Sequence, residues 1–320
     1  MTDSRTEHLF VRNMRSCAAD FIYEGEQAGL PNPSNVDEPL GLMRAADVPE
    51  SKIHMSHTWI RPITEAQHWV DEHEHDYDEI LIWTGSDPKN PEDLGAELFF
   101  EIEGVRHSVS TSGSVYIPAG TKHCPLGFTS IERPFNFSAL SLSSGYSSGE
   151  EDGAVQPALH DRLRPAEPPY ERLFTRELRA CAADMVNEGD AAGKPRPHNL
   201  SNPWAIVRAE DVAEAKAYIT MSWVHPTDEP QHWVDEHTHD YDEVLVWTGS
   251  DPDDPHSLGG EVTFEIDGEQ HIVSTSGSVY IPAGTRHCPL GFNRVDRPFR
   301  FMAIALSGDG HYLSEAERGK

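Results

Sequence analysis

Cysteines, basic residues and long apolar runs are all scarce in this chain. Its 320 residues include four cysteines without the spacing of a disulfide-rich secreted domain, so reduced thiols are expected. Lys and Arg number 25 against 54 Asp and Glu, and this acidity argues against nucleic acid or an anionic membrane as a partner. No apolar run approaches the roughly 18 residues of a membrane span, and no apolar signal-peptide core is present. These shortages predict a soluble, cytoplasmic protein.

The most prominent feature that is present is a long internal repeat, in which matching residues lie 164 positions apart. The run Gln67–Pro88 returns as Gln231–Pro252 with three changes, and Ser110–Gly127 returns as Ser274–Gly291 with one. No gap is needed from about residue 9 to about residue 145. A unit of this length can bury its own core, unlike the short units of a solenoid, so the chain carries a duplicated domain.

The segment between the copies differs from both of them. It is rich in Ser, Gly, Glu and Pro and has little apolar periodicity, which is typical of a linker. We therefore expect an N-terminal domain over residues 1–145, a linker over 146–169 and a C-terminal domain over 170–320.

Each copy is predicted to contain one short helix followed by many strands, an all-β fold. From Ile53 onward apolar and polar residues alternate with the period of a strand, and His57 and Arg61 fall on one face, expected to line the barrel. The segment Glu79–Trp83 is apolar on both faces, which indicates a strand that is covered on both sides. The helix is predicted from a stripe at helical spacing: Leu9, Phe10, Met14, Cys17, Phe21 and Ile22.

Four residues of metal-ligand type occur in each copy. On a strand, residues i and i+2 point the same way, so His73 and His75 can hold one ion, and Glu79 follows at the start of the next strand. Three imidazoles and a carboxylate supply most of the coordination sphere of a divalent first-row metal. The alternative is a group of ordinary buried or surface histidines, but a complete set found twice predicts two metal sites per chain: His73, His75, Glu79 and His123, and His237, His239, Glu243 and His287.

The two motifs that carry these ligands resemble those of the cupins, and their duplication resembles a bicupin. The first motif reads His-Glu-His-Asp-Tyr-Asp-Glu over residues 73–79 and is closed by Gly85, and the second reads Pro-Ala-Gly-Thr-Lys-His over 118–123. The resemblance covers roughly residues 53–142 and 217–306. It implies two tandem jelly-roll barrels, each with a metal bound inside by those four residues.

Two further pairs are candidates for catalytic roles around the metals. His107 and His271 could reach each pocket as acid–base groups, or they could be hydrogen-bonded histidines of a strand. Tyr77 and Tyr241 could donate a hydrogen bond to a metal-bound substrate, or they could pack in a turn.

Aromatic and sulfur-containing side chains complete the predicted surroundings of each metal. Trp83 and Trp247 follow the ligand glutamates by two inward steps and are expected to line the cavity, as core or as a substrate wall. Cys124 and Cys288 each follow a ligand histidine and are expected to point the other way, into the core.

The strand expected to line the barrel differs between the copies. Arg61 at the mouth of the first site could bind a carboxylate with two hydrogen bonds, whereas its counterpart His225 could do so only when protonated. We therefore expect the first site to take an anionic substrate, and the two sites to differ in ligand or in activity.

A site of three imidazoles and one carboxylate leaves two octahedral positions open, which suits a substrate, or a substrate and O2. The first expectation is a dioxygenase acting on a small oxygenated, anionic organic molecule with Fe(II), and Mn(II), Ni(II), Cu(II) or Zn(II) are the other metals considered. The alternative is an isomerase, decarboxylase or lyase that uses the ion as a Lewis acid. A non-enzymatic small-ligand binding protein is the third, and association into a homo-oligomer is left open.

Overall fold

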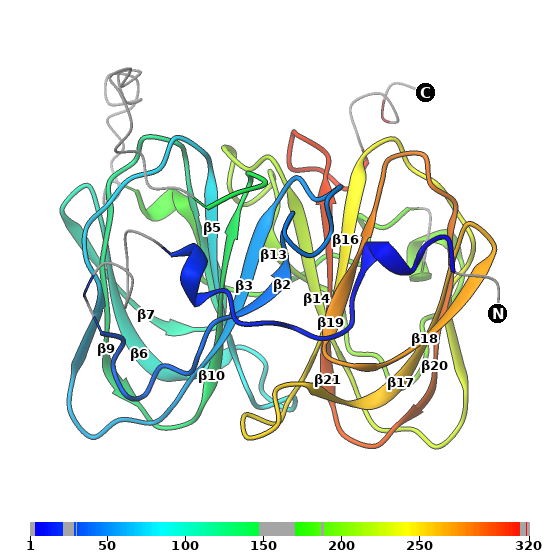
Figure 1. Cartoon of the computed structure of the whole chain (residues 1–320), viewed down its shortest axis with the longest axis horizontal. Coiled ribbons are helices and arrows are strands. Elements are labelled where there is room, and N and C mark those ends of the chain that lie inside the picture. Colours follow the sequence, from blue (N-terminus) through cyan, green and yellow to red (C-terminus); the bar gives the residue numbers. More distant parts are fainter. Residues whose placement is uncertain are drawn as a thin grey trace. The chain divides into compact units, whose positions relative to one another are not determined.

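The computed structural model describes residues 4–21, 29, 31–146, 170–186, 189–313 and 318. The regular structure in these residues is almost entirely antiparallel β, so the predicted all-β fold is confirmed (Figure 1). Apart from Tyr146, the expected linker over 146–169 lies outside the described residues. The described part of the chain contains no helix that is long and apolar enough to cross a membrane.

The first unit of the chain comprises Arg15–Ala45 and Lys52–Glu177. It contains a six-stranded sheet, in the order β11-β8-β5-β10-β3-β2, and a four-stranded sheet, in the order β4-β9-β6-β7. Its strands are β2 (Leu40–Met43), β3 (His54–Ile60), β4 (Gln67–Val70), β5 (Glu79–Gly85), β6 (Asp93–Ile102), β7 (Val105–Thr111), β8 (Gly113–Ile117), β9 (His123–Ile131), β10 (Phe135–Ser141) and β11 (Phe174–Thr175).

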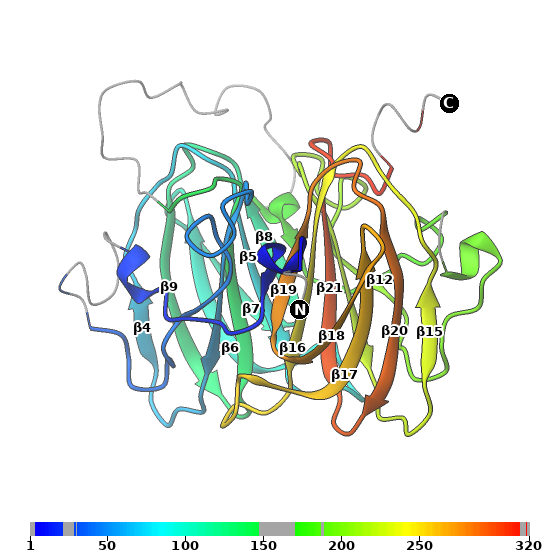
Figure 2. The same cartoon turned by 45° about the vertical axis from the view of Figure 1, so that its right-hand side comes forward.

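The second unit comprises Met1–Met14, Ala46–Ser51 and Leu178–Lys320. It contains a seven-stranded sheet, in the order β1-β19-β16-β21-β14-β13-β12, and a four-stranded sheet, β15-β20-β17-β18, whose strands can be followed in Figure 2. Its strands are β1 (Phe10–Val11), β12 (Arg179–Ala180), β13 (Trp204–Val207), β14 (Tyr218–Val224), β15 (Gln231–Val234), β16 (Asp242–Gly249), β17 (Ser257–Ile266), β18 (Glu269–Thr275), β19 (Gly277–Ile281), β20 (His287–Val295) and β21 (Phe299–Leu306).

Each compact unit takes in the N-terminal segment of the other copy of the repeat. Strand β1, from the start of the chain, pairs with β19 of the second unit through Phe10 and Val279. Strand β11 pairs with β8 of the first unit through Phe174 and Val115. The physical cause is backbone pairing, because each short strand satisfies the hydrogen-bonding groups at the edge of a sheet.

The prediction of a helix from the apolar stripe was wrong, because the described residues form short 3-10 turns and a strand instead. The order is η1 (Glu7–Leu9), β1 and η2 (Ala18–Asp20), with η5 (Glu171–Leu173) and η6 (Gly189–Ala192) in the second copy; Ile22 lies outside the described residues. The apolar side chains are buried even so. Phe10, for example, is 8% exposed and packs on His271 with ring centroids 4.4 Å apart. Tertiary contacts therefore override the local helical pattern.

The strands that carry the candidate site are covered on both faces. Every residue of β3, β5 and β8 is buried, which confirms the prediction for Glu79–Trp83. The hairpin between β6 and β7 turns at Glu103 and Gly104, both with positive φ (49° and 72°), the conformation that glycine adopts without strain. These buried strands give the ligands a rigid support.

Candidate metal centres

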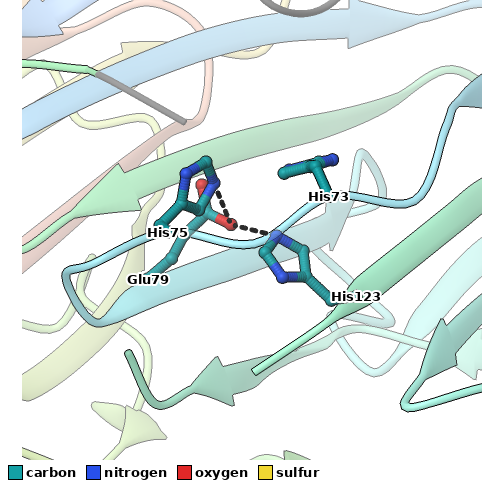
Figure 3. Close-up of side chains that lie close together, drawn as sticks. All are labelled: His73, His75, Glu79 and His123. Carbon is teal, nitrogen blue, oxygen red and sulfur yellow. Dashed lines mark ion pairs between the residues drawn. The ribbon is translucent and has the colours of Figure 1, made fainter. Parts of the chain in front are cut away.

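The four predicted ligands of the first copy converge inside the first unit (Figure 3). Glu79 is the first residue of β5, as expected from the sequence, and His123 is the first residue of β9. His73 lies beyond the end of β4 and exchanges two backbone hydrogen bonds with His123, at 3.0 and 2.9 Å. This backbone pair fixes the spacing of the two imidazoles, and the four donor atoms lie within 4.8 Å of one another.

Backbone carbonyls fix the tautomers of the ligand histidines. His73 Nδ1 lies 2.9 Å from Asp71 O, and His123 Nδ1 lies 2.9 Å from Thr121 O. A carbonyl only accepts, so each Nδ1 carries a proton and each Nε2 is left to bind a cation. His123 Nε2 is buried and lies 3.2 Å from Glu79 Oε2. The lone pair of His123 Nε2 and the carboxylate oxygen of Glu79 repel each other at this distance unless a proton or a metal ion lies between them. The arrangement therefore fits a bound cation.

The carboxylate of Glu79 stays ionised although it is 3% exposed. Burial raises the pKa of Glu79, but the hydrogen bond with His123 and the charges of His75, His123 and His73 outweigh burial and lower it to about 2. In the second copy burial and the same kind of histidine contacts act on Glu243, and its pKa also lies below the usual range. Each centre therefore offers one anionic oxygen donor beside three imidazole nitrogens, a set suited to a divalent first-row metal.

The second centre has the same four residues, with one pair of imidazole rings farther apart. Glu243 Oε2 lies 3.4 Å from both His239 Nε2 and His287 Nε2. The rings of His237 and His239 are 5.9 Å apart, compared with 4.9 Å for His73 and His75. As a result, the donor atoms within 4.8 Å of one another form two groups that share one histidine: His239, Glu243 and His287, and His237, His287 and Cys288.

A cavity adjoins each centre, and the two cavities differ in size. The first has a volume of about 80 Å³ and the second about 30 Å³. At roughly 10–15 Å³ per water-sized probe, the first accommodates a small organic molecule and the second little more than two waters. Neither cavity has a Lys or Arg among its described lining residues. Those of the first are Ala18, Phe21, Asn32, Val36, Pro39, Ser56, Thr58, Trp69, Val70, His73, Glu79, Leu81, His123, Cys124, Leu126, Phe137, Ala139 and Tyr146.

The face of β3 that lines the first cavity is the opposite of the predicted one. Ser56 and Thr58 line it, whereas His57 and Arg61 do not. Because both faces of β3 are buried, alternation could not distinguish them. The guanidinium of Arg61 forms an ion pair with Asp37, with Nε and Nη2 at 2.9 and 2.8 Å from Oδ2. Arg61 is therefore not a described lining residue of the first cavity, and a role in binding substrate stays a prediction.

The other predicted substrate-binding residues also lie outside the described cavity linings. Trp83 is 1% exposed, donates its Nε1–H to Thr111 O at 3.0 Å and belongs to the core. Trp247 is fully buried, and the residue of β16 that lines the second cavity with Glu243 is Leu245. His225 does not line that cavity either, and burial lowers its pKa, which disfavours the protonated form needed to bind an anion.

The candidate catalytic tyrosines stack on ligand histidines. Tyr77 lies on His75 with ring centroids 4.6 Å apart and planes 12° apart, and Tyr241 lies on His239 at 4.1 Å and 5°. The hydroxyl of Tyr241 donates to Tyr312 O at 2.9 Å. Neither tyrosine is a described lining residue; each packs on an imidazole, and a contact with substrate stays a prediction.

The candidate catalytic histidines hold the exchanged segments. His107 Nδ1 lies 3.2 Å from Glu171 Oε2, beside β11. His271 contacts Thr6 Oγ1 at 2.8 Å through Nε2 and Arg12 Nη2 at 3.1 Å through Nδ1. Neither histidine is a described lining residue of a cavity, and the acid–base role stays a prediction beside the structural contacts that these histidines make.

Cys124 and Cys288 lie beside the candidate metal centres, and the direction of their side chains was predicted wrongly. Both line a cavity, although alternation predicted that they point into the core. Their positive φ values, 66° and 64°, and a register shift between β6 and β9 near Cys124 mark a bulge that turns the side chain inward. The proline that follows each cysteine could have indicated the bulge, because proline is tolerated at such positions.

Comparison with known proteins supports the fold. No family model matches the chain, and no curated protein matches it in sequence. A variant of the oxalate decarboxylase of Bacillus subtilis matches with a TM-score of 0.53 and 14% identity, over 95% of this chain and 79% of that chain. Another structure of oxalate decarboxylase matches with a TM-score of 0.52 and 13% identity, over 86% and 74%. AerE from Microcystis aeruginosa matches with a TM-score of 0.49 and 12% identity, over 93% and 98%.

The first two matches agree with the paired antiparallel sheets and with the motifs met twice in the sequence. The chain therefore has a fold similar to that of oxalate decarboxylase, in agreement with the bicupin fold that its motifs imply.

Proposed function

We propose that this protein is a metal-dependent cupin enzyme whose first centre acts on a small oxygenated organic acid, with decarboxylation as the leading reaction. Isomerisation and lyase chemistry use the same Lewis-acid principle and belong to the same proposal. Two observations support it: the compact ligand set beside the 80 Å³ cavity, and the likeness of fold to oxalate decarboxylase. The dioxygenase reaction expected first from the sequence has less support than this alternative.

The metal is proposed to be a divalent first-row ion bound by His73, His75, Glu79 and His123. Imidazole and carboxylate donors suit Mn(II) as well as Fe(II), so the donor set gives no reason to place iron first. When bound, the ion would supply a Lewis acid that stabilises negative charge on substrate oxygen atoms. The tautomers set by Asp71 O and Thr121 O leave the imidazole Nε2 atoms available to it.

The observation that carries the proposal is the charge of the first cavity. A divalent ion, the Glu79 carboxylate and three neutral imidazoles leave about one unit of positive charge. The described lining contains no Lys or Arg to add to it. A substrate carboxylate would therefore be bound through the metal centre, and the match in charge is best for a monoanion.

The remaining lining residues provide the surroundings of such a reaction. The hydroxyls of Ser56 and Thr58 lie on one wall and can hydrogen-bond to substrate oxygen atoms. Leu81, Leu126 and Phe137 form apolar walls that exclude water and so strengthen the electrostatic interactions at the centre. Loss of CO2 from a carboxylate disperses its charge, and an apolar wall favours that change.

The test is an anaerobic assay of the whole protein, loaded in turn with Mn(II), Fe(II), Co(II), Ni(II) and Zn(II). Small β-keto, α-keto and α-hydroxy monocarboxylates are the substrates, with release of CO2 and product NMR as readouts. We expect turnover without oxygen, and a loss of about 100-fold in Glu79→Gln, because ligand geometry is then no longer fixed. The matched variant Glu243→Gln should retain most of the activity.

The assay with oxygen present decides between the candidates. Turnover that requires O2 and consumes it with product would select the dioxygenase, which the two open coordination positions also allow. Specific binding of a small acid, with no turnover for any of the metals, would instead support the non-enzymatic binding protein.

A further inference from the structure

The two centres differ in the sets of donor atoms that lie close to one another. In the first, all four nitrogen and oxygen donors lie within 4.8 Å of one another. In the second, a separate group within this distance consists of His237, His287 and the thiol of Cys288. Cys124, at the matching place in the first copy, belongs to no such group among the described residues.

The backbone aims these three side chains at one place. His237 and His287 exchange two backbone hydrogen bonds, at 3.0 and 3.1 Å, and their rings lie 4.3 Å apart. Their Nδ1 atoms lie 2.9 Å from Asp235 O and Thr285 O, so each Nε2 is available as a donor. Cys288 follows directly, and its φ of 64° turns the thiol into the cavity beside the buried Nε2 of His287.

The wall of the second cavity adds a second sulfur atom. Met185 lines it where Phe21 lines the first cavity, so a thioether accompanies the thiol of Cys288. Sulfur ligands favour softer ions, whereas a carboxylate favours harder ones. The volume of about 30 Å³ also suits an ion of low coordination number, which needs no room for several water ligands.

We propose that the second centre is a thiolate-bearing metal site, in which His237, His287 and Cys288 bind a borderline or soft divalent ion such as Zn(II). The two centres of one chain then differ in metal preference despite identical histidine and glutamate sets. Glu243 Oε2 lies 3.4 Å from both His239 Nε2 and His287 Nε2, and the proposal leaves this carboxylate paired with His239, outside the ligand set. The inference concerns the second centre alone and does not depend on the reaction proposed for the first.

Cobalt(II) is the probe, because a cobalt–thiolate bond gives an intense charge-transfer absorption in the near ultraviolet that nitrogen and oxygen ligands do not give. The full-length protein is titrated with Co(II) after removal of bound metal. We expect this absorption in the wild-type protein, its loss in Cys288→Ser, and its retention in the matched variant Cys124→Ser. Glu243→Gln should also retain it, since the carboxylate is outside the proposed ligand set.

X-ray absorption of the zinc-loaded protein gives an independent readout. A zinc–sulfur distance of about 2.3 Å is expected in the wild-type protein and in Cys124→Ser, and only lighter donors in Cys288→Ser. Melting temperatures of the metal-free variants identify any that fail to fold. The proposal is overturned if two Co(II) ions bind without the charge-transfer absorption, if the absorption persists in Cys288→Ser, or if Cys124→Ser removes it.

Discussion

At the scale of single residues, identical ligand sets are placed in unequal surroundings. The first centre has its four donors gathered beside a cavity of about 80 Å³, and the second has a cavity of about 30 Å³. Phe21, Ser56 and Thr58 of the first wall correspond to Met185, Thr220 and Ser222 of the second. The size and lining of the cavity therefore differ between the two centres in the structure, and neither Arg61 nor His225 is a described lining residue.

Removal of one ligand histidine from each centre tests this difference. We expect His123→Ala to lower turnover by about 100-fold or more, because the other donors no longer fix the ion's geometry. His287→Ala should leave most of the turnover, since the small second cavity does not admit the substrate. Elemental analysis should show about one metal fewer per chain in each variant. Equal losses of activity would contradict the assignment of catalysis to the first centre.

A second residue-scale prediction concerns the acid side of the stability profile. The carboxylate of Glu269 accepts hydrogen bonds from Ser4 and Thr6 and from the backbone of Thr6 and Arg5, which lower its pKa from 4.5 to about 2. A folded-state pKa below the unfolded one means that the stabilisation is complete above pH 4.5 and is lost as the pH falls through about 2.

Melting temperatures measured from neutral pH down to pH 2 check this window. Glu269→Gln should melt below the wild-type protein at neutral pH, and the difference should vanish as the pH approaches 2. Glu265→Gln, on the adjacent strand β17, is the control because its carboxylate is not among the groups bonded to the segment 4–6. A difference for Glu269→Gln that does not change with pH would contradict the mechanism.

At the scale of the element, the short strands β1 and β11 are each held by an arginine that occurs at the same place in both copies of the repeat. Arg12 Nη1 donates to Ile272 O at 2.8 Å, and its guanidinium lies 4.7 Å from the ring of Phe10. In the other unit, Arg176 Nη1 donates to Ser108 O at 2.7 Å. The short strands are therefore anchored by side chains as well as by their backbone pairs.

Truncation of the aromatic anchors measures what the exchange contributes. Phe10 is 8% exposed and its counterpart Phe174 is 7% exposed. We expect Phe10→Ala and Phe174→Ala each to lower the free energy of unfolding by about 3 kcal/mol, as for a buried phenylalanine in a packed core. Urea denaturation provides the measurement. The exposed Ile272→Ala is a control that should change stability by less than about 0.5 kcal/mol.

The same elements show why the sequence predicted some features and not others. The ligand sets were predictable because two short motifs carry them and both motifs occur twice in the chain. The lining face of β3 was not, because both of its faces are buried and alternation then carries no information. The pairing of Phe10 with Val279 was not predictable either, since no local pattern encodes which distant sheet edge receives a strand.

At the scale of the whole molecule, each unit is incomplete without a segment from the other repeat. The sheet of the first unit ends in β11, which follows the segment expected as a linker, and the sheet of the second unit ends in β1. A division of the chain at the repeat boundary would therefore leave the edges of β8 and β19 without their partner strands. An uncovered edge strand exposes unpaired backbone groups and promotes association.

The last prediction follows from this incompleteness. Fragments 1–145 and 170–320, expressed separately, should each be unstable or aggregate, because each lacks a strand of its sheet and carries one that belongs to the other. Expressed together, they should copurify as a one-to-one complex, and Phe10→Ala and Phe174→Ala should weaken it. A fragment 15–177, which retains β11 with β8, should be more stable than 1–145. Size-exclusion chromatography and urea denaturation distinguish these cases. If 1–145 and 15–177 were equally stable monomers, the exchanged strands would add nothing to the fold, and the unit boundaries would be those of the repeat.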